Sequence, residues 1–382
     1  MSSTRKSICF VVAVPMTASA FLLNHFEVLS REFDIYLVAN FEGVNSNLKD
    51  NPNLKAIHSI GIQRDISVLK DFKSLLELRT YLKKMKFDAV LTVTPKAGLL
   101  GILAAALGGI KNRIHIFTGQ VWHTKSGLFK LILMSIDKLI FNLASTVLVD
   151  GKAQREYLIK NGIIDSYRSQ VLGNGSISGV DTRRFFPDQN LRERYRNQIH
   201  YQAKDLVFTF LGRLNADKGI LDLAQAFEEL QKKYNNVRLL LIGYDEENLV
   251  PMVKQIVSKN DLVHYFGPTT VPNEALQAAD VFCLPSYREG FGSSVIEASL
   301  LELPVICSDT YGLKETIIEN ETGLRHKTGD SNSILVQMEK MVLDPLARLK
   351  MGEEGRKYVI NNFTAESVSL EWLSFFRKIL MP

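Results

Sequence analysis

The amino-acid sequence predicts an α/β protein built from two Rossmann-like domains. Short apolar runs, which are typical of buried parallel strands, alternate with segments of helical periodicity along most of the chain. The length of 382 residues suits two domains better than one. A stretch rich in Gly, Asn and Ser, at 172–181, interrupts the alternation near its middle and is typical of a domain boundary. We therefore expect one domain over 1–172 and a second over 173–363.

The composition is that of an ordinary globular protein, with 46% hydrophobic and 23% charged residues. The net charge of +5 is compatible with an anionic substrate or an anionic membrane surface but requires neither. Cys9, Cys283 and Cys307 all fall in apolar, strand-like runs, and an odd number of cysteines in such places indicates buried free thiols. We therefore expect a reducing compartment, the cytoplasm.

In the first half, the apolar run 7–14 is the first expected strand, because it is too short for a signal peptide with a cleavage site. Strand-like and helical segments then alternate, which predicts a parallel sheet with helices on both faces. The ligand crevice of such a sheet lies at the carboxyl ends of its strands, so we expect the loops 15–17, 94–96 and 118–120 to line it. The further strands are expected at 35–39, 54–60, 88–93, 113–117 and 146–149, and the helices at 18–30, 67–86, 95–107 and 125–143.

The segment 125–143 is unusually apolar, and Lys125, Lys130 and Lys138 are among its few charges. A helix of this kind can dock on an anionic membrane surface, with its apolar side buried shallowly and its lysines near the headgroups. The alternative is a helix that faces the core of the first domain, and we favour this interpretation. Both interpretations hold if the helix is partly exposed.

The second half begins with a polar, basic segment at 183–201, which predicts a surface helix. A second α/β series follows it. Its strands are expected at 208–211, 237–242, 263–266, 281–284 and 304–307, and its helices at 218–233 and 293–301, with a last helix at 364–380.

The stretch 285–297, with the sequence PSYREGFGSSVIE, combines a glycine turn with the start of a helix. Gly290, Phe291 and Gly292 form the turn, and Ser293 and Ser294 are candidate N-cap residues. A strand, a glycine turn and a helix N-terminus make an anion site, because free backbone N–H groups and the helix dipole both favour negative charge.

Two glutamates, Glu289 and Glu297, flank this turn. Carboxylates are good acceptors for sugar hydroxyls, so the stretch suits a ligand with both phosphate and hydroxyl groups, such as a nucleotide sugar. The alternative is a glycine loop of another Rossmann-like domain with two solvated glutamates.

Two cations, Arg213 and Lys218, lie in the strand-to-helix loop 212–219, which has the sequence GRLNADKG. Cations at the carboxyl end of a strand and beside a helix N-terminus suit a diphosphate. The alternative is a pair of solvated surface charges, since most Arg and Lys side chains are exposed.

These motifs resemble those of the retaining family 4 glycosyltransferases of the GT-B fold. Glu289 and Glu297 match the E-x7-E signature, and 212–219 matches the G-R-x4-K-G arrangement that binds the donor's phosphates. The segment 174–181 is similar to the family's N-G-x-x-x-G-V-D crossing between the domains. The resemblance is specific over 212–330 and weaker over the first half.

The resemblance implies a donor site in the second domain. Arg213 and Lys218 would bind the diphosphate, Glu289 would position the sugar and act with them in catalysis, and Glu297 would bind the ribose. The last helix, within 364–382, would return to pack on the first domain. The remaining donor-binding residues implied are Asn174, Gly212, Gly267, Gly290, Phe291, Gly292 and Ser293.

The acceptor side departs from the family pattern. Pro15 and Thr17 follow the first strand where the family often has a glycine pair, and Thr118 takes the approximate place of a family histidine. The nearest histidine, His123, is either a participant in the chemistry or a surface-loop histidine. We treat Pro15, Thr17, Thr118 and His123 as the acceptor-side candidates.

The resemblance implies retaining transfer of a hexose or N-acetylhexosamine from a UDP-sugar. Relatives that share the run Thr-Gly-Gln-Val-Trp assemble bacterial surface polysaccharides on polyprenyl diphosphate carriers, so we expect a lipid-linked saccharide acceptor and a place at the inner face of the cytoplasmic membrane. No cofactor or metal is expected, because the sequence has neither an Asp-x-Asp pair nor a His/Cys cluster with ligand spacing. No nucleic-acid motif is present. The alternatives are a nucleotide-sugar epimerase of the same fold and a non-enzymatic sugar-binding protein.

Overall fold

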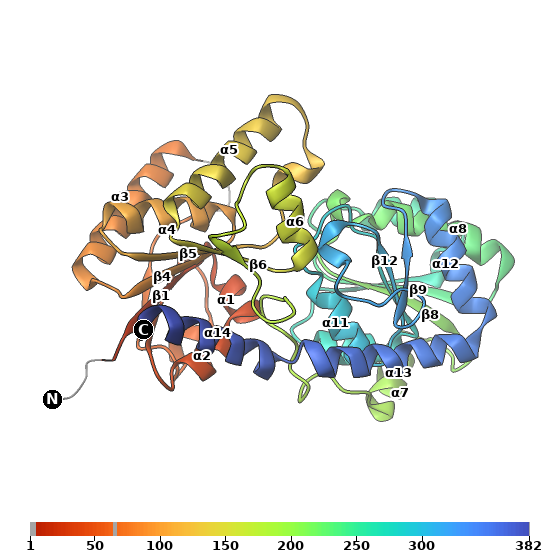
Figure 1. Ribbon diagram of the computed structural model, residues 1–382. Coiled ribbons are helices and arrows are strands. Elements are labelled where there is room, and N and C mark those ends of the chain that lie inside the picture. Colours follow the sequence, from red (N-terminus) through yellow and green to blue (C-terminus); the bar gives the residue numbers. More distant parts are fainter. Residues whose placement is uncertain (1–4, 64–66, 382) are drawn as a thin grey trace. The chain divides into compact units, whose positions relative to one another are not determined.

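The computed structural model describes residues 5–63 and 67–381 (Figure 1). The chain divides into two compact units, residues 1–179 with 365–382 and residues 180–364. Each unit contains a parallel sheet with helices packed on it, so the predicted fold class of two parallel α/β domains is confirmed.

The sheet of the first unit has the order β3-β2-β1-β4-β5-β6-β7, and all of its pairings are parallel. Its strands are β1 (Ser7–Val11), β2 (Asp34–Ala39), β3 (Ala56–Ser59), β4 (Ala89–Val93), β5 (Asn112–Phe117), β6 (Thr146–Val149) and β7 (Ser169–Gln170). Its helices are α1 (Pro15–Phe21), α2 (Leu23–Leu29), η1 (Asn47–Asp50), α3 (Val68–Met85), α4 (Pro95–Leu107), η2 (Val121–Thr124), α5 (Gly127–Leu143), α6 (Lys152–Lys160) and α14 (Ala365–Leu380).

Both faces of this sheet are buried, as the apolar runs predict. Side chains alternate across a strand, so Ile8 and Phe10 of β1 join one core and Cys9 and Val11 join another. Figure 1 shows α3, α4 and α5 on one face and α2 and α14 on the other. Within the described residues, no helix is long and apolar enough to cross a membrane.

The first helical segment differs from the prediction, because 18–30 belongs to two short helices rather than one. Pro15, whose fixed φ suits the first turn of a helix, begins α1 three residues before the expected start. Leu22, with φ of −117° and ψ of −8°, ends α1 and precedes α2. Leu22 is nevertheless buried, and apolar periodicity runs through the break, which is why the sequence pattern conceals it.

The last helix, α14, packs on α2 of the first unit. Trp372 stacks on His25 with ring centroids 4.0 Å apart, and the Oγ of Ser369 lies 2.9 Å from the Nδ1 of His25. The other ring nitrogen, Nε2, lies 2.6 Å from the carbonyl oxygen of Ile177. Burial lowers the pKa of His25 to about 4, so the ring is neutral and structural.

The boundary of the first unit lies later in the chain than predicted. The sequence interpretation assigns residues 173–179 to the second domain, but they belong to the first unit. The amide of Ser176 donates to the carbonyl of Asp150 at 2.7 Å, which ties the segment to the end of β6. The second unit begins at Val180, whose amide donates to the carbonyl of Phe363.

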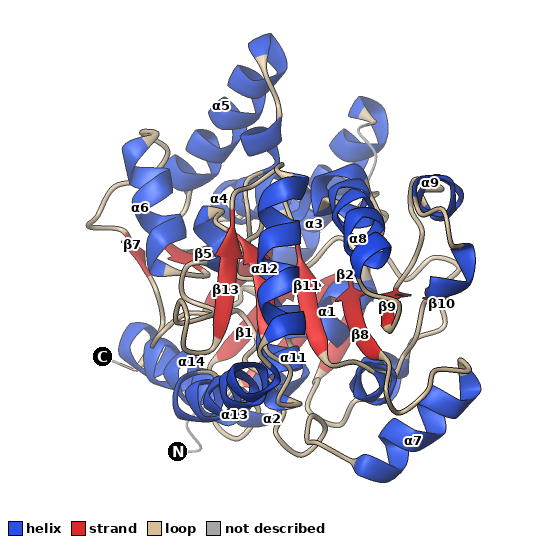
Figure 2. Ribbon diagram, turned by 90° about the vertical axis from the view of Figure 1, so that its right-hand side faces the viewer, coloured by secondary structure: helices blue, strands red, loops and turns tan. Residues whose placement is uncertain are grey.

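The sheet of the second unit has the order β10-β9-β8-β11-β12-β13 and is also parallel. Its strands are β8 (Leu206–Leu211), β9 (Val237–Ile242), β10 (Val263–Gly267), β11 (Val281–Leu284), β12 (Val305–Ser308) and β13 (Gly323–His326). Figure 2 shows α8 and α12 packed side by side along this sheet. The helices are α7 (Gln189–Gln198), η3 (Ala216–Lys218), α8 (Ile220–Lys233), α9 (Val250–Ile256), η4 (Asn260–Leu262), α10 (Pro272–Ala275), η5 (Leu276–Ala278), α11 (Ser293–Leu300), η6 (Tyr311–Leu313), α12 (Ser331–Leu343) and α13 (Pro345–Asn362).

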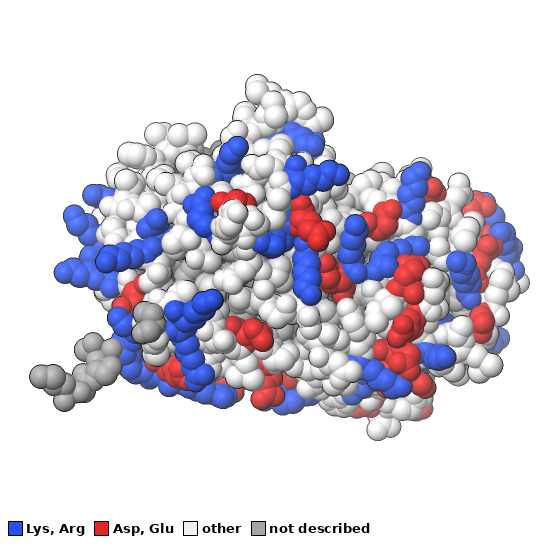
Figure 3. Space-filling view, in the orientation of Figure 1, with Lys and Arg blue, Asp and Glu red and all other residues white. Residues whose placement is uncertain are grey.

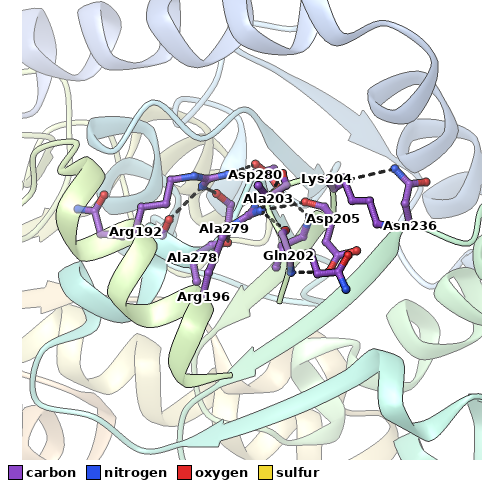
Figure 4. A network of polar contacts seen from close by, with 12 residues as sticks. Arg192, Arg196, Gln202, Ala203, Lys204, Asp205, Asn236, Ala278, Ala279 and Asp280 are labelled. Carbon is purple, nitrogen blue, oxygen red and sulfur yellow. Dashed lines mark hydrogen bonds and ion pairs between the residues drawn. The ribbon is translucent and has the colours of Figure 1, made fainter. Parts of the chain in front are cut away.

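The predicted surface helix is α7, and it is joined to the sheet by a partly buried polar network (Figure 4). Arg192 and Arg196 each place an Nη2 atom on a different oxygen of Asp280, at 2.5 and 2.6 Å. The amide of Val207, in β8, donates to the same carboxylate at 2.7 Å. Asp280 therefore links α7 to β8 and to the start of β11. α7 is a surface helix, as predicted, and its buried residues are Tyr195 and Arg196.

Candidate functional site

The first loop of the site runs from the carboxyl end of β8 to the start of α8. It contains Arg213 and the short helix η3, which ends at Lys218. Gly219 follows with φ of +68°, and a Cβ there would lie 2.2 Å from the carbonyl oxygen of Pro285. Only glycine lets this loop approach the loop after β11 so closely, which explains the Lys-Gly pair of the motif.

The second loop runs from β11 into α11. Gly292, with φ of +71°, is the N-cap of α11, and a Cβ there would lie 2.2 Å from Cδ2 of Leu313. The expectation that Ser293 or Ser294 caps the helix was wrong, because both already lie inside α11 and no side chain caps its first turn. The first amides of α11 therefore remain suited to an anion.

The two loops are connected by an ion pair between Lys218 and Glu289. The Nζ of Lys218 lies 2.5 Å from Oε1 of Glu289, and the two side chains are only 20% and 12% exposed. The Oγ of Ser286 donates to the same carboxylate oxygen at 2.7 Å. The structure thus brings together two charged residues that the sequence identified in separate motifs.

Three further contacts fix one loop on the other. Nε of Arg288 donates to Oδ2 of Asp217 at 2.9 Å, and the amide of Tyr287 donates to the Asp217 carbonyl at 2.8 Å. The Tyr287 hydroxyl donates to Asp222 in α8 at 2.8 Å, and this hydrogen bond raises the pKa of Tyr287 to about 12. The relative position of the two loops is therefore determined before any ligand binds.

Arg213 is paired with an acid that the sequence interpretation did not include. Its Nη1 lies 2.7 Å from both carboxylate oxygens of Glu246, which follows β9. Its side chain is 49% exposed, so part of the guanidinium can still be reached.

Glu297 lies in α11, one to two turns from the glycine turn. Its side chain is partly covered, and burial raises the pKa of the carboxyl to about 7, against an opposing effect of the Arg184 charge. An acid with this pKa changes its charge near neutral pH, so any hydroxyl that binds it finds a pH-dependent acceptor.

Comparison with known proteins decides the family. A family model described as "Glycosyl transferases group 1" matches residues 192–358. The capsular polysaccharide biosynthesis glycosyltransferase CapM of Staphylococcus aureus is 31% identical over 92% of this chain and 91% of its own length. The chain belongs to the group 1 glycosyltransferases. A UDP-Gal:alpha-D-GlcNAc-diphosphoundecaprenol alpha-1,3-galactosyltransferase of Escherichia coli is 28% identical over 89% of this chain and 88% of its own length.

Solved structures of glycosyltransferases share the fold of this one. A sucrose-phosphate synthase of Thermosynechococcus elongatus superimposes with a TM-score of 0.84 and 20% identity, covering 99% of this chain and 100% of its own. WaaG, a glycosyltransferase of lipopolysaccharide biosynthesis, gives a TM-score of 0.77 and 16% identity over 97% of this chain and 98% of its own. The predicted GT-B fold is confirmed.

The structure gives the positions of the other predicted donor-side residues, whose roles in binding stay predictions. The side chain of Phe291 is 2% exposed and packs edge-to-face on Phe363, so a contact of Phe291 with the donor would come from its backbone, and its role in donor binding stays a prediction. Gly290 is buried in the turn, and Gly267 ends β10 with φ of +83°. Gly212 follows β8, where its amide donates to the carbonyl of Ile242.

Asn174 belongs to the first unit, whereas all other predicted donor-binding residues belong to the second. It is exposed and lies between Gly173, with φ of +54°, and Gly175, with φ of +106°. Its role in donor binding stays a prediction.

The acceptor-side candidates lie at the carboxyl ends of strands in the first unit. Pro15 and Thr17 lie in the first turn of α1, the helix that follows β1, and Thr118 follows β5. His123 lies in η2, half-buried, with its Nδ1 2.8 Å from the hydroxyl of Tyr157 in α6. It is therefore packed rather than a freely solvated loop histidine.

The sequence interpretation missed the acids that fix the two loops and the acid that contacts Arg213. Asp217 and Asp222 fix the loops, and Glu246 contacts Arg213 directly. One signal could have revealed the last of these: the acidic run at 245–247 stands at the carboxyl end of a predicted strand, where the crevice of a parallel sheet lies.

Proposed function

We propose that this glycosyltransferase transfers a hexose or N-acetylhexosamine from a UDP-sugar to a polyprenyl-diphosphate-linked saccharide, with retention of anomeric configuration, in the assembly of a bacterial surface polysaccharide. The observation that carries the proposal is the ion pair between Lys218 and Glu289, which joins the loop after β8, where Arg213 also lies, to the glycine turn before α11. Phosphate and sugar hydroxyls need cations, free amides and carboxylates, and all three kinds of group lie here.

The donor and acceptor classes are supported by relatives. The galactosyltransferase of Escherichia coli is named for a UDP-sugar donor and a diphosphoundecaprenol-linked acceptor. A relative from Campylobacter jejuni, 23% identical, is named for a diphospho-undecaprenol-linked acceptor. HepE of Anabaena, which shares the fold with a TM-score of 0.81, was solved with UDP and glucose.

In the proposed reaction, the bond between the sugar C1 and the diphosphate oxygen breaks while a bond from C1 to the acceptor oxygen forms on the same face. The acceptor proton passes to an oxygen of the leaving diphosphate. Negative charge grows on this diphosphate, and Arg213, Lys218 and the first amides of α11 stabilise it. Glu289 positions the sugar hydroxyls, and Glu297 accepts from the ribose. We propose that these groups act without a metal ion or cofactor.

A membrane contact through α5 is also proposed. One side of α5 is buried and another is exposed: Ile140 and Phe141 are buried, whereas Leu128 is 73% and Leu131 is 59% exposed. The core-facing interpretation therefore holds for one side of α5, and the exposed side supports the proposed membrane contact. Figure 3 shows uncharged surface over the end of α5 at the top of the view, with basic side chains beside it. Such a surface suits an anionic bilayer.

The activity is tested by incubating the protein in EDTA with UDP-sugars, with and without a polyprenyl-diphosphate-linked saccharide, and following UDP release. The proposal predicts acceptor-dependent release with one donor. A sugar nucleotide converted to its epimer without release would contradict transfer and support an epimerase. Activity that EDTA abolishes and Mg²⁺ restores would contradict the metal-independent mechanism.

The membrane contact is tested by flotation with anionic liposomes. We expect binding that weakens with salt and that is lost when Leu128 and Leu131 are both replaced by glutamate. Absence of flotation at low salt would contradict the contact, and a saccharide without a lipid would then be the acceptor to test.

A further inference from the structure

The acid that pairs with Arg213 is Glu246, which also has contacts to other parts of the loop after β8. Glu246 lies in the loop after β9, and both of its carboxylate oxygens lie 2.7 Å from a single nitrogen of Arg213, Nη1. The Oε2 atom also accepts from the side-chain amide of Asn215 at 2.6 Å. Asn215 is 8% exposed, so this side of the carboxylate is enclosed by the β8 loop.

The backbone around Glu246 is anchored to the same loop. The amide of Leu214 donates to the carbonyl of Tyr244 at 2.8 Å, and the amide of Glu246 donates to the carbonyl of Leu214 at 3.0 Å. The loop also caps the next helix, because Asp245 accepts from the amides of Leu249 and Val250 at 2.7 and 3.0 Å. The Glu246 carboxylate is therefore fixed by its own backbone and by Asn215, independently of Arg213.

The Glu246 carboxylate contacts the Arg213 guanidinium at one nitrogen, Nη1. Arginine presents five N–H donors in a rigid plane, and a fork-like carboxylate pair would use two of its nitrogens. Here both hydrogen bonds from Arg213 to the Glu246 carboxylate come from the same nitrogen, Nη1. The edge formed by Nε and Nη2 has the donor geometry that matches a phosphate.

We propose that Glu246 is a positioning residue that holds Arg213 by Nη1 and so presents its Nε and Nη2 edge to the donor diphosphate. This inference rests on the proposed function of Arg213. The other interpretation is that Glu246 occupies the phosphate position until the donor displaces it. The anchoring of Glu246 opposes displacement, because its carboxylate would have to leave Asn215 while its backbone remains tied to Leu214.

The test is a double-mutant cycle in the acceptor-dependent assay with wild type, Glu246→Gln, Arg213→Ala and the double variant. Glutamine keeps the shape but loses the charge that holds the guanidinium. We expect Glu246→Gln to lower kcat at least about tenfold in the presence of Arg213, since misplaced catalytic groups cost rate steeply. In the Arg213→Ala background the same change should alter kcat less than about twofold. Glu246→Asp should lie between wild type and Glu246→Gln.

Glu247→Gln is the matched control from the same loop, because Glu247 accepts from the amide of Ala216 and glutamine keeps a carbonyl acceptor. This control should retain wild-type kcat. Equal losses from Glu246→Gln with and without Arg213 would show a general effect on the loop and overturn the inference. A lower donor KM or a higher kcat in Glu246→Gln would overturn it in favour of displacement. UDP release by wild type that Arg213→Ala leaves unchanged would overturn the phosphate role of Arg213 itself.

Discussion

Lys218 and Glu289, 71 residues apart in the sequence, form an ion pair with 2.5 Å between Nζ and Oε1. The pair joins the loop after β8 to the loop after β11, so the residue expected to bind phosphate lies beside the residue expected to position the sugar. A diphosphate and the sugar attached to it are neighbouring groups of one ligand, so neighbouring residues can bind them. The contact therefore supports the assignment of both residues to one ligand.

Replacing Arg213 or Lys218 tests whether these cations stabilise the transition state more than they stabilise the bound donor. We expect Arg213→Ala and Lys218→Ala each to lower kcat by about 10² or more, because charge on the diphosphate grows as the glycosidic bond breaks. Steady-state kinetics with the preferred donor measures the effect. Lys232→Ala is the control, since this exposed lysine pairs with Glu229 and Glu228 in α8. Near-wild-type kcat in both test variants would remove them from the site.

Glu297 should give donor binding a pH dependence. Its folded pKa of about 7 lies above the ordinary value, so the neutral acid predominates below pH 7 and the carboxylate above it. Ribose hydroxyls donate more strongly to the carboxylate, so the donor KM should fall as the pH rises from about 6 to about 8. Glu297→Ala should raise the donor KM, because a charged acceptor contributes about 1.5–3 kcal/mol. A KM that varies equally with pH in Glu297→Gln would show that another group is responsible.

The Asp280 network should be a determinant of the second unit's stability. Asp280→Asn leaves Arg196, whose side chain is 6% exposed, beside a neutral amide. Breaking a buried pair costs about 3–5 kcal/mol, and we expect a loss of about 3 kcal/mol because the carbonyl of the new amide side chain can still accept one hydrogen bond. Chemical denaturation followed by far-UV circular dichroism measures it. The exposed pair of Glu229 and Lys232 supplies the control, and Glu229→Gln should change the unfolding free energy by less than about 1 kcal/mol.

Because of Asp150, at the end of β6, the free energy of unfolding should fall as the pH rises. It is 5% exposed, its Oδ1 is buried without a hydrogen-bond partner, and burial raises its pKa to about 8. The folded state thus binds the proton more tightly than the unfolded state, so this stabilisation is complete below pH 3.8 and is lost as the pH rises to about 8. Asp150→Asn should remove a slope of up to about 1.4 kcal/mol per pH unit from the unfolding free energy. An unchanged slope in Asp150→Asn, as expected for the exposed control Glu42→Gln, would refute the assignment.

The strands and the two glycine-containing motifs that we propose to bind phosphate could be predicted because their signals are local. Buried parallel strands are nearly continuous apolar runs, and Gly219 and Gly292 are needed where two backbones or a side chain come too close for a Cβ. The N-cap of α11 could not be predicted by composition, since Gly292 and the serines after it all favour that position.

The remaining features depend on contacts between distant segments. Arg192 and Arg196 resemble surface charges in the sequence because their shared partner, Asp280, lies 88 and 84 residues away. Arg213 likewise gives no sign of its pairing with Glu246, 33 residues later. Exposed and buried sides of α5 differ in packing rather than hydrophobicity, so periodicity could not distinguish Leu131 from Ile140.

Hydrogen–deuterium exchange with and without saturating UDP, in EDTA, tests the central claim most directly. If the carboxyl edge of the second sheet binds the diphosphate, amides in 212–219 and 289–297 should exchange more slowly with UDP, and the Arg213→Ala/Lys218→Ala double variant should not show this change. Unchanged exchange of both segments in the wild type at saturating UDP would contradict the donor site described for this glycosyltransferase.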